Sequence, residues 1–252
     1  MKRKLLFSFI ILTAILPSAL LSAQAGGLTA DQIITRMENM SSPDTAVITG
    51  RMITRDSFGS KESTFTSWAQ GDNKSLIEFT SVEEQGQKIL RVDDSLYVYY
   101  PDAQRTIRMQ GSALRDSVMG SDYSYEDMTT GDRGILDDYS AELIGTEPVN
   151  GFDCYRIKLT ARARDLPYYM KEIWVDKNLY VYRKMQMFAL SGRLLKEVEV
   201  REIKKYGPYQ VPVTTVMTDK MKRNSSTTFV IESLETDISL DRNFFSLREL
   251  SR

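Results

Sequence analysis

Two pairs of adjacent aspartates have the residue types and spacing that could support catalysis. Asp93-Asp94 and Asp137-Asp138 supply the residue types of a general acid and base pair. Adjacent strand residues point to opposite faces, however, and both pairs lie among turn-forming residues. The chain contains no histidine, which excludes Ser-His-Asp and Cys-His nucleophile systems and the usual zinc sites. We therefore expect solvated turns, with no enzymatic activity, cofactor or metal.

The single cysteine, Cys154, is the other candidate for covalent chemistry. It cannot form a disulfide within the chain, and it lies at the expected start of a strand over residues 152–157. A cysteine in such a position commonly serves as a small buried apolar side chain. We expect a packed thiol, with folding based on apolar burial and sheet hydrogen bonds.

The overall charge is balanced, with 33 lysines and arginines against 34 aspartates and glutamates. A chain without a broad positive field has no long-range attraction for a polyanion. We therefore expect no nucleic-acid partner.

Residues 1–25 have the pattern of an export signal. A positive segment at residues 2–4 precedes an apolar run at residues 5–21, and residues 23–25 form an A-x-A cleavage pattern. We predict a signal peptide cleaved after Ala25 and a location in the periplasm. The alternative is an uncleaved membrane anchor, because the apolar run approaches the ~18 residues that suggest a membrane span.

The first element expected after this signal is a helix over residues 29–40. Thr29 can cap it, while Gln32, three residues later, reaches back as in a capping box. Apolar side chains then recur at helical spacing on one face. They are Ile33, Ile34, Met37 and Met40. An amphipathic helix this short needs another surface to lie against.

From residue 46 onward the pattern changes to short runs rich in β-branched and aromatic residues, separated by turn signals about every ten residues. The runs are 47–55, 62–70, 74–80, 86–92, 96–100, 105–109, 139–145, 152–160, 169–175, 180–189, 194–206, 211–219 and 227–234. Some of these runs are expected to be irregular, which leaves about eleven true strands. Asn150-Gly151 is the type I′ hairpin signal between two of them.

About eleven strands exceed what an open twisted sheet usually holds without curling. We therefore predict a mainly β fold, in which one antiparallel sheet curves strongly into an incomplete barrel with a concave apolar face. The length after the signal suits one large domain over residues 26–252.

The stretch at residues 109–128, called the central stretch below, interrupts this pattern. Residues 112–119 can form a short helix with Leu114, Val118 and Met119 on one side, ended by Gly120. Ser124 can cap a second turn that runs to residue 128, before a flexible loop at residues 130–134. Such an interruption could cover the open face of a curved sheet, or it could be a long surface excursion.

Methionine is abundant, at 12 residues. Its flexible, polarizable side chain suits a surface that accepts varied apolar ligands, although ordinary core filling is the reading that the pattern by itself favours. The candidate residues for lining an apolar cavity are Ile33, Met37, Met52, Met109, Leu114, Met185, Met187 and Met217.

The residues Met-Gly-Ser-Asp-Tyr-Ser-Tyr-Glu-Asp-Met at positions 119–128 resemble a signature of the outer-membrane lipoprotein-sorting proteins, a branch of the LolA/LolB-like lipid-carrier superfamily. The signature of that branch ends in leucine, where this chain has Met128. The export signal, the helix at residues 29–40 and the strand end at Trp174-Val175-Asp176 agree with the same family, and the likeness extends over the mature chain.

This resemblance implies an incomplete antiparallel barrel in which a helical lid closes an apolar cavity. It implies a non-enzymatic, monomeric periplasmic carrier that binds acyl chains of a lipid or lipoprotein and transfers them toward the outer membrane. The expected partner is an inner-membrane lipid exporter or lipoprotein-releasing complex. The expected lid residues are Met119, Gly120, Asp122, Tyr123, Tyr125, Glu126, Asp127 and Met128.

Two features keep alternatives open at this stage. Envelope-stress regulators with the same fold offer a second hypothesis, a sensor or adaptor that binds a protein partner, since a fold does not determine a function.

Glu126 and Asp127 are expected to favour the start of a helix or to pair with Arg115 or Arg133. The basic clusters at residues 204–205 and 220–223 are expected to face water at strand ends.

Overall fold

The computed structural model describes residues 27–129 and 134–251. The predicted signal, its cleavage after Ala25 and the side chain of Arg133 lie outside the described residues. The strands are β1 Thr45–Asp56, β2 Gly59–Gln70, β3 Lys74–Phe79, β4 Lys88–Val92, β5 Ser95–Tyr100, β6 Arg105–Met109, β7 Tyr139–Val149, β8 Phe152–Ala161, β9 Met170–Asp176, β10 Tyr182–Phe188, β11 Leu194–Tyr206, β12 Tyr209–Asp219 and β13 Ser226–Thr236. The helices are α1 Ala30–Ser41, η1 Gly111–Arg115, η2 Val118–Gly120, α2 Tyr125–Thr129, α3 Ile135–Asp138 and α4 Leu247–Leu250.

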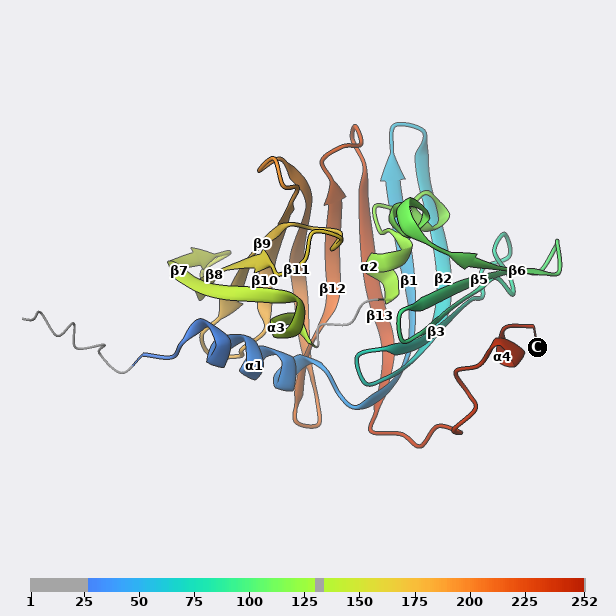
Figure 1. Cartoon of the computed structure of the whole chain (residues 1–252), viewed down its shortest axis with the longest axis horizontal. Helices are drawn as coiled ribbons and strands as arrows, with labels where there is room; N and C mark the ends of the chain where they lie inside the picture. Colours follow the sequence, from blue (N-terminus) through green and yellow to red (C-terminus); the bar gives the residue numbers. More distant parts are fainter. Residues whose placement is uncertain (1–26, 130–133, 252) are drawn as a thin grey trace, which may run out of the picture.

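The strands form one antiparallel sheet in the order β6-β5-β4-β3-β2-β1-β13-β12-β11-β10-β9-β8-β7 (Figure 1). Two meanders run outward from the centre, one from β1 to β6 and the other from β13 back to β7, and the pairing of β1 with β13 joins them. In the described structure β6 and β7 are edge strands, so the curved sheet does not close into a barrel. The predicted fold class is confirmed, with thirteen strands instead of about eleven.

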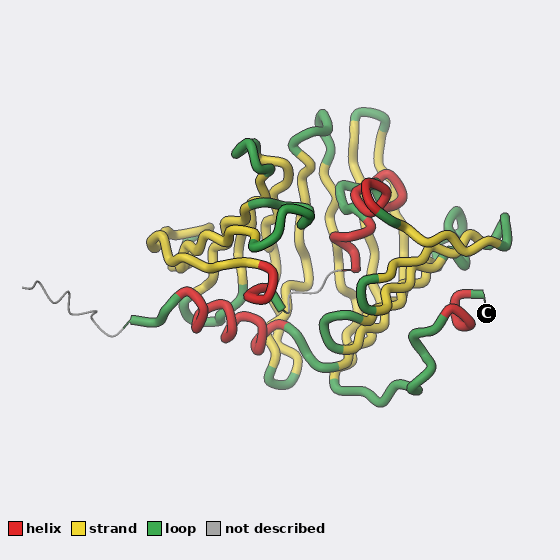
Figure 2. Tube along the Cα trace, in the orientation of Figure 1, coloured by secondary structure: helices red, strands yellow, loops and turns green. Residues whose placement is uncertain are grey.

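The local signals explain why these strands form where they do. Each of the thirteen runs with β-type composition is a strand, because turn residues separate it from the next. Asn150 and Gly151 both have positive φ, at 50° and 85°, as the predicted type I′ turn requires. Figure 2 shows how few helices interrupt the strands.

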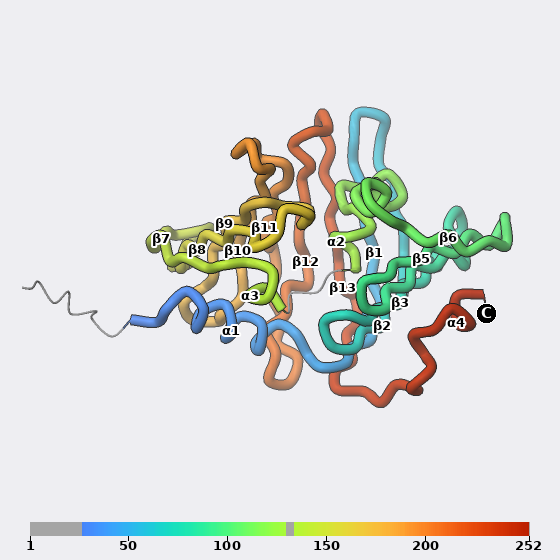
Figure 3. Tube along the Cα trace, in the orientation of Figure 1, coloured from blue at the N-terminus to red at the C-terminus, as the bar shows by residue number. Residues whose placement is uncertain are grey.

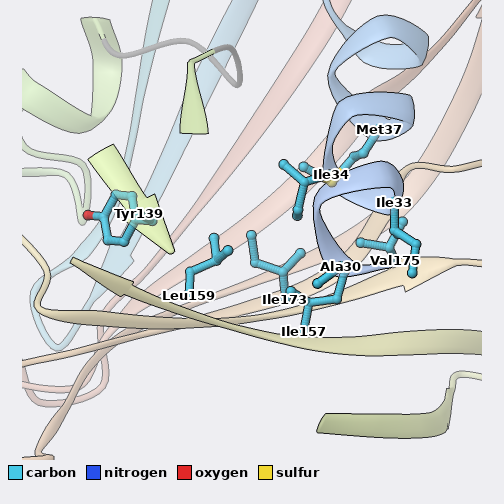
Figure 4. Close-up of a cluster of buried hydrophobic side chains, with 9 residues drawn as sticks. All are labelled: Ala30, Ile33, Ile34, Met37, Tyr139, Ile157, Leu159, Ile173 and Val175. Carbon is cyan, nitrogen blue, oxygen red and sulfur yellow. The ribbon is translucent and has the colours of Figure 1, made fainter. Parts of the chain in front are cut away.

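The helix α1 packs its apolar face against one half of the sheet, next to β7 and β12. Thr29 and Gln32 form the predicted capping box, with hydrogen bonds of 3.2 and 3.0 Å. Ile33, Ile34 and Met37 are fully buried. They contact the strands β7 to β9 through Tyr139, Ile157, Leu159, Ile173 and Val175 (Figure 4). This burial gives the short helix the packing surface that it needs.

The central stretch is less helical than predicted. The expected helix at residues 112–119 is wrong: η1 and η2 are two short 3₁₀ turns, and Ser117 makes a β-bridge with Ser124. Met119 and Gly120 have φ of 52° and 77°, so the chain turns sharply there. The predicted second turn is present as α2, and Ser124 caps it by accepting a hydrogen bond of 3.2 Å from the Asp127 amide.

The C-terminal segment after β13 covers the other face of the sheet. Phe245 and Leu250 pack against Leu76 and Leu90, which project from β3 and β4. The four-residue helix α4 is too short to be stable alone, so this packing holds it in place. Within the described residues, no helix has the length and apolar character needed to cross a membrane.

Candidate functional site

The central stretch lies over the inner face of the curved sheet. It belongs to the connection between β6 and β7, which are the two edges of the sheet, so this connection passes from one edge to the other. Val118 and Tyr125 are buried against side chains of β1 to β5, and Tyr123 also contacts the side chains of β10 to β12. In Figure 3 the green tube of α2 lies in front of β13 and β1. The surface excursion considered from the sequence is therefore not what the chain forms.

Asp122 is the first polar anchor of the central stretch. Its side chain is buried, and its Oδ2 accepts a hydrogen bond of 2.8 Å from the Thr227 hydroxyl of β13. The Asp122 amide donates to the same hydroxyl at 2.9 Å, while Oδ1 accepts from the Asp219 amide at 3.3 Å. An aspartate with three such bonds to two strands fixes the backbone position of the motif.

Asp127 is the second anchor and has a cationic partner. Its Oδ2 lies 2.5 Å from the Lys196 ammonium of β11, and Oδ1 accepts from the Tyr168 hydroxyl at 2.8 Å. Burial by itself raises the pKa of Asp127, but Lys196 and the bonds from Ser124 and Tyr168 hold that pKa below its ordinary value. Burial and this carboxylate together raise the pKa of Tyr168, so the phenol stays protonated and can donate.

Lys222, in the turn between β12 and β13, is the third anchor. Its ammonium donates to the Ser121 carbonyl at 2.5 Å, to the Ser117 hydroxyl at 2.8 Å and to the Gly120 carbonyl at 3.2 Å. The expectation that the basic cluster at residues 220–223 simply faces water is therefore wrong for Lys222. The side chain is drawn inward because the sharp turn at Met119 and Gly120 presents carbonyl groups to it.

Two apolar cavities lie beneath the central stretch, one on each side of a contact between aromatic rings. The rings of Tyr123 and Phe229 have centroids 5.8 Å apart. Tyr123 lines one cavity and Phe229 lines the other, so the contact between these rings lies between the two spaces.

The first space, here called the methionine cavity, has a volume of about 140 Å³. Its walls come from α2, β8 to β12 and the segment before β9. Three of the predicted lining residues, Met185, Met187 and Met217, line it together with Val198 and Ile173. The lid residues Tyr123 and Asp127 also border it.

The second space, here called the phenylalanine cavity, has a volume of about 210 Å³ and lies against β1 to β3 and β13. Phe65, Ile77, Ile48 and Phe229 supply its apolar wall, and Met128 of the motif borders it. An apolar cavity of ~150 Å³ holds a molecule the size of benzene. By volume, each space therefore holds only part of an acyl chain while the central stretch stays in place.

A third, more polar cleft of about 340 Å³ lies where the two halves of the sheet approach each other. Residues of β4 and β5 line one side, and residues of β7 and β9 line the other. Glu126 borders this cleft beside Lys171. Burial and the neighbouring Asp127 carboxylate raise the pKa of Glu126, although Arg115, Arg91 and Lys171 act in the opposite direction.

The remaining predicted residues have other positions. Ile33 and Met37 are fully buried between α1 and the sheet, and Met52 is buried beneath the central stretch. Met109 and Leu114 are half-buried against the same cluster as Met52, and Leu114 also borders the polar cleft. These residues pack in the core near the cavities and line neither of the two apolar cavities.

The lid residues of the motif also differ in exposure. Met119 and Met128 are half-buried, Tyr125 is buried, and Gly120 is exposed at its turn. Of the alternatives for Glu126 and Asp127, a place in the first turn of a helix is confirmed. The cation paired with Asp127 is Lys196 and not Arg115, while the side chain of Arg133 lies outside the described residues. Arg115 instead acts on Glu126 through its charge.

The carboxylate pairs considered for catalysis lie in a turn and a short helix, and one member of each pair, Asp94 and Asp138, borders the polar cleft. Asp93 accepts a hydrogen bond of 2.6 Å from Asn73 in the turn before β5, whereas Asp137 and Asp138 belong to α3. Cys154 is fully buried, and burial raises the pKa of its thiol to about 11. In the described ranges no cluster of carboxylates and thiols could hold a metal ion.

Lys196, Tyr168 and Thr227 are the residues of this site that sequence reasoning did not identify. Each lies at least 41 residues away in sequence from the aspartate that it binds. The sequence did indicate that such partners exist, because Asp122 and Asp127 lie in a motif with apolar side chains, and a buried carboxylate needs a hydrogen-bond or ionic partner.

Comparison with known proteins agrees with this geometry. Residues 71–252 match the model of a protein family described as "uncharacterized protein". The chain belongs to this family. The matched range begins at the turn between β2 and β3 and includes the whole central stretch. No curated protein matches the chain.

Solved structures match nearly the whole chain. A domain assigned to outer-membrane lipoprotein sorting, from Vibrio parahaemolyticus, superposes with a TM-score of 0.80 at 22% identity, over 89% of this chain and 98% of that one. A LolA superfamily protein from Nitrosomonas europaea superposes with a TM-score of 0.76 at 20% identity, over 88% and 100% respectively. The resemblance inferred from residues 119–128 is thus confirmed as a shared fold.

Proposed function

We propose that this protein is a periplasmic carrier that holds the acyl chains of a lipid or lipoprotein and transfers them toward the outer membrane. The observation that carries the proposal is the pair of apolar cavities between the curved sheet and the central stretch. The two solved structures, named for lipoprotein sorting and the LolA superfamily, support the same reading.

The cavity walls supply the binding energy in this proposal. Each CH₂ group removed from water contributes ~0.8 kcal/mol, so an acyl chain of ordinary length can be held without a covalent step. Methionine side chains rearrange easily around different chain shapes, which suits Met185, Met187 and Met217 to varied cargo.

Loading requires the central stretch to act as a lid. Because each cavity is smaller than an acyl chain, Tyr123 must move away from Phe229 so that the two spaces join. The Asp122, Asp127 and Lys222 anchors oppose this movement. Cargo binding is favourable when burial of the acyl chain stabilises the open form by more than release of the lid costs.

Export and release complete the proposal. Residues 1–25 direct the chain to the periplasm, with cleavage after Ala25, and an inner-membrane lipid exporter or lipoprotein-releasing complex supplies the cargo. No catalytic step is needed, because transfer only requires an acceptor that offers a better apolar surface. The carrier works as a monomer in this scheme.

Native mass spectrometry with lipid extraction, on protein purified from the periplasm without detergent, tests this function. We expect a bound lipid or acylated peptide, and uptake of a fluorescent fatty acid by delipidated protein. Met185→Trp fills the methionine cavity and Met217→Asp places a charge in it, so each should weaken uptake at least about tenfold. Met170→Trp is the matched control, because Met170 is the first residue of β9 and lines neither cavity.

Circular dichroism first establishes which variants fold. If Met217→Asp does not fold, Met185→Trp carries the test. A protein that purifies without lipid and takes up no fatty acid would contradict the carrier function and favour a sensor that binds a protein partner.

A further inference from the structure

We propose that three hairpin turns at one end of the sheet dock this protein on an anionic bilayer surface. The turns, together called the rim, are residues 55–61, 189–193 and 219–223, which connect β1 to β2, β10 to β11 and β12 to β13. The proposal rests on the carrier function, because docking at the rim brings the methionine cavity to a membrane.

The strand registers place the three turns at the same end of the sheet. Arg55 of β1 pairs with Ser226 of β13, and Asp219 of β12 pairs with Lys196 of β11. Leu194, at the start of β11, pairs with Phe188 at the end of β10. The turns therefore lie side by side along six neighbouring strands, as the three hairpins at the top of Figure 1 show.

Each of the three turns exposes one large apolar side chain. Phe58 is 97% exposed, Leu190 is 66% exposed and Met221 is 47% exposed. Asp56 fixes the first turn by accepting hydrogen bonds from the Phe58 and Gly59 amides, and Asp219 accepts one from the Met221 amide. The side chains are thus held outward by ordered turns.

The same turns are basic, although the chain as a whole has a net charge of −1. The rim contains six lysines and arginines against two aspartates. An exposed arginine accompanies each apolar side chain: Arg55 with Phe58, Arg193 with Leu190, and Arg223 with Met221. None of these three arginines has a salt bridge to a residue that the structure describes. Lys61 and Lys220 do have acidic partners, Glu84 and Glu197.

The opposite ends of the same strands differ from the rim. The turn between β2 and β3 is Gly71-Asp72-Asn73, and the turn between β11 and β12 is Gly207-Pro208. Neither turn exposes a large apolar side chain. The combination of apolar tips and arginines is therefore absent from these two turns at the opposite ends of the strands.

The arrangement fits a bilayer surface better than a protein partner. Neighbouring rim turns are two strand spacings apart, roughly 10 Å, so their tips form separate projections and not one contiguous apolar patch. A protein interface needs a packed apolar centre, whereas a bilayer can accept separate side chains among its headgroups. Arginines next to these side chains attract anionic lipid headgroups.

The rim also lies next to the cavity and the lid. Met217 is two residues before Asp219, and Met187 is three residues before Leu190, so the methionine cavity lies close behind two of the turns. Lys222 belongs to the rim and holds the Ser121 carbonyl of the lid. A phosphate group that attracts Lys222 would weaken this anchor, so docking and lid opening favour each other.

Flotation of the full chain with vesicles tests the rim. One set contains phosphatidylglycerol and phosphatidylethanolamine, and the other contains phosphatidylcholine alone. We expect binding to the anionic vesicles, at least about tenfold weaker in Phe58→Ser/Leu190→Ser/Met221→Ser. In Arg55→Ser/Arg193→Ser/Arg223→Ser we expect about fivefold weaker binding per arginine, roughly a hundredfold in all, and the difference from wild type should disappear at high salt.

The matched control is Ile107→Ser/Leu143→Ser/Leu247→Ser, which removes three exposed apolar side chains outside the rim. It should bind within about twofold of wild type, and any binding by residues 1–25 is common to all variants. Equal binding by the rim variants and wild type, or no binding to anionic vesicles, would overturn the rim proposal. Fatty-acid uptake, measured on the same variants, separates this result from failure of the carrier function, which abolishes uptake in wild type too.

Discussion

At the scale of single residues, the two aspartates of the motif show how one short sequence is attached to a sheet. Asp122 accepts neutral hydrogen bonds from β12 and β13, whereas Asp127 pairs with a buried ammonium. Glu126, between tyrosine and aspartate, faces the polar cleft and has a raised pKa. At neutral pH the Glu126 carboxylate therefore lowers the stability of the folded protein, whereas the Asp127 carboxylate raises it.

Glu126→Gln should stabilise the protein at pH 7. The folded state raises the pKa of Glu126 above its ordinary value of 4.5, so stability from this group is present at low pH and is lost as pH rises. Because glutamine does not ionise, the variant does not lose this stability as pH rises. The free energy of unfolding, measured in urea, should exceed that of wild type at pH 7, and the two should converge near pH 3.5, about one unit below the ordinary pKa. A lower free energy for Glu126→Gln at pH 7 would contradict this account.

At the scale of elements, α2 has only five residues and depends on its tertiary contacts. Its cap is a reciprocal pair, because the Ser124 amide donates to Asp127 while the Asp127 amide donates to Ser124. The same Asp127 carboxylate also binds Lys196 of β11. The helix start and its attachment to the sheet are therefore one structural unit.

Lys196→Met should loosen this unit. The substitution leaves Asp127 buried without its cation, which costs about 3 kcal/mol of the free energy of unfolding at neutral pH. Hydrogen exchange of residues 117–129 should increase in the variant. Because the lowered pKa of Asp127 means that its stabilisation is lost as pH falls through that value, the difference from wild type should shrink in acid.

The double variant Asp127→Asn/Lys196→Met removes the unpaired charge and should recover part of the loss. Lys204→Met, at a more exposed lysine of the same strand, is the control and should change stability by less than about 0.5 kcal/mol. Equal destabilisation by both lysine variants would show that the Asp127 pair does not hold the lid.

At the scale of the whole molecule, the two meanders meet along β1 and β13, and both faces of the sheet are used. The inner face carries the central stretch and its cavities, and the outer face of β3 and β4 is covered by the C-terminal segment. Hairpin turns at one end form the rim. The outer packing therefore stabilises the curved sheet through contacts that do not involve the central stretch.

Leu250→Ala should destabilise the whole protein, because Leu250 is fully buried against the outer face of the sheet. Loss of this side chain costs about 3 kcal/mol, a usual value for leucine to alanine in a core. Leu247→Ala, at a half-exposed position of the same helix, should have little effect. Thermal unfolding monitored by circular dichroism compares the two, and an equal effect would contradict the packing role of α4.

Local patterns of the sequence were sufficient for most of the fold. Runs of β-branched and aromatic residues, separated by turn signals, predicted the position of every strand, and Thr29 with Gln32 predicted the start of α1. These features depend on neighbours within a few residues, so no distant contact is needed to recognise them. The motif at residues 119–128 likewise predicted the family fold and a cover over the inner face.

Only the tertiary structure decided how that cover is held and what lies beneath it. Instead of the helix expected at residues 112–119, the chain turns sharply at Met119 and Gly120, and Lys222, about a hundred residues later, binds carbonyl groups of this turn. Lys196 reaches Asp127 across 69 residues of sequence. Such pairings, and the cavities that the strands enclose, arise only when sheet curvature brings distant side chains together. The sequence by itself determined the elements and their order, while packing determined the anchors and the spaces between them.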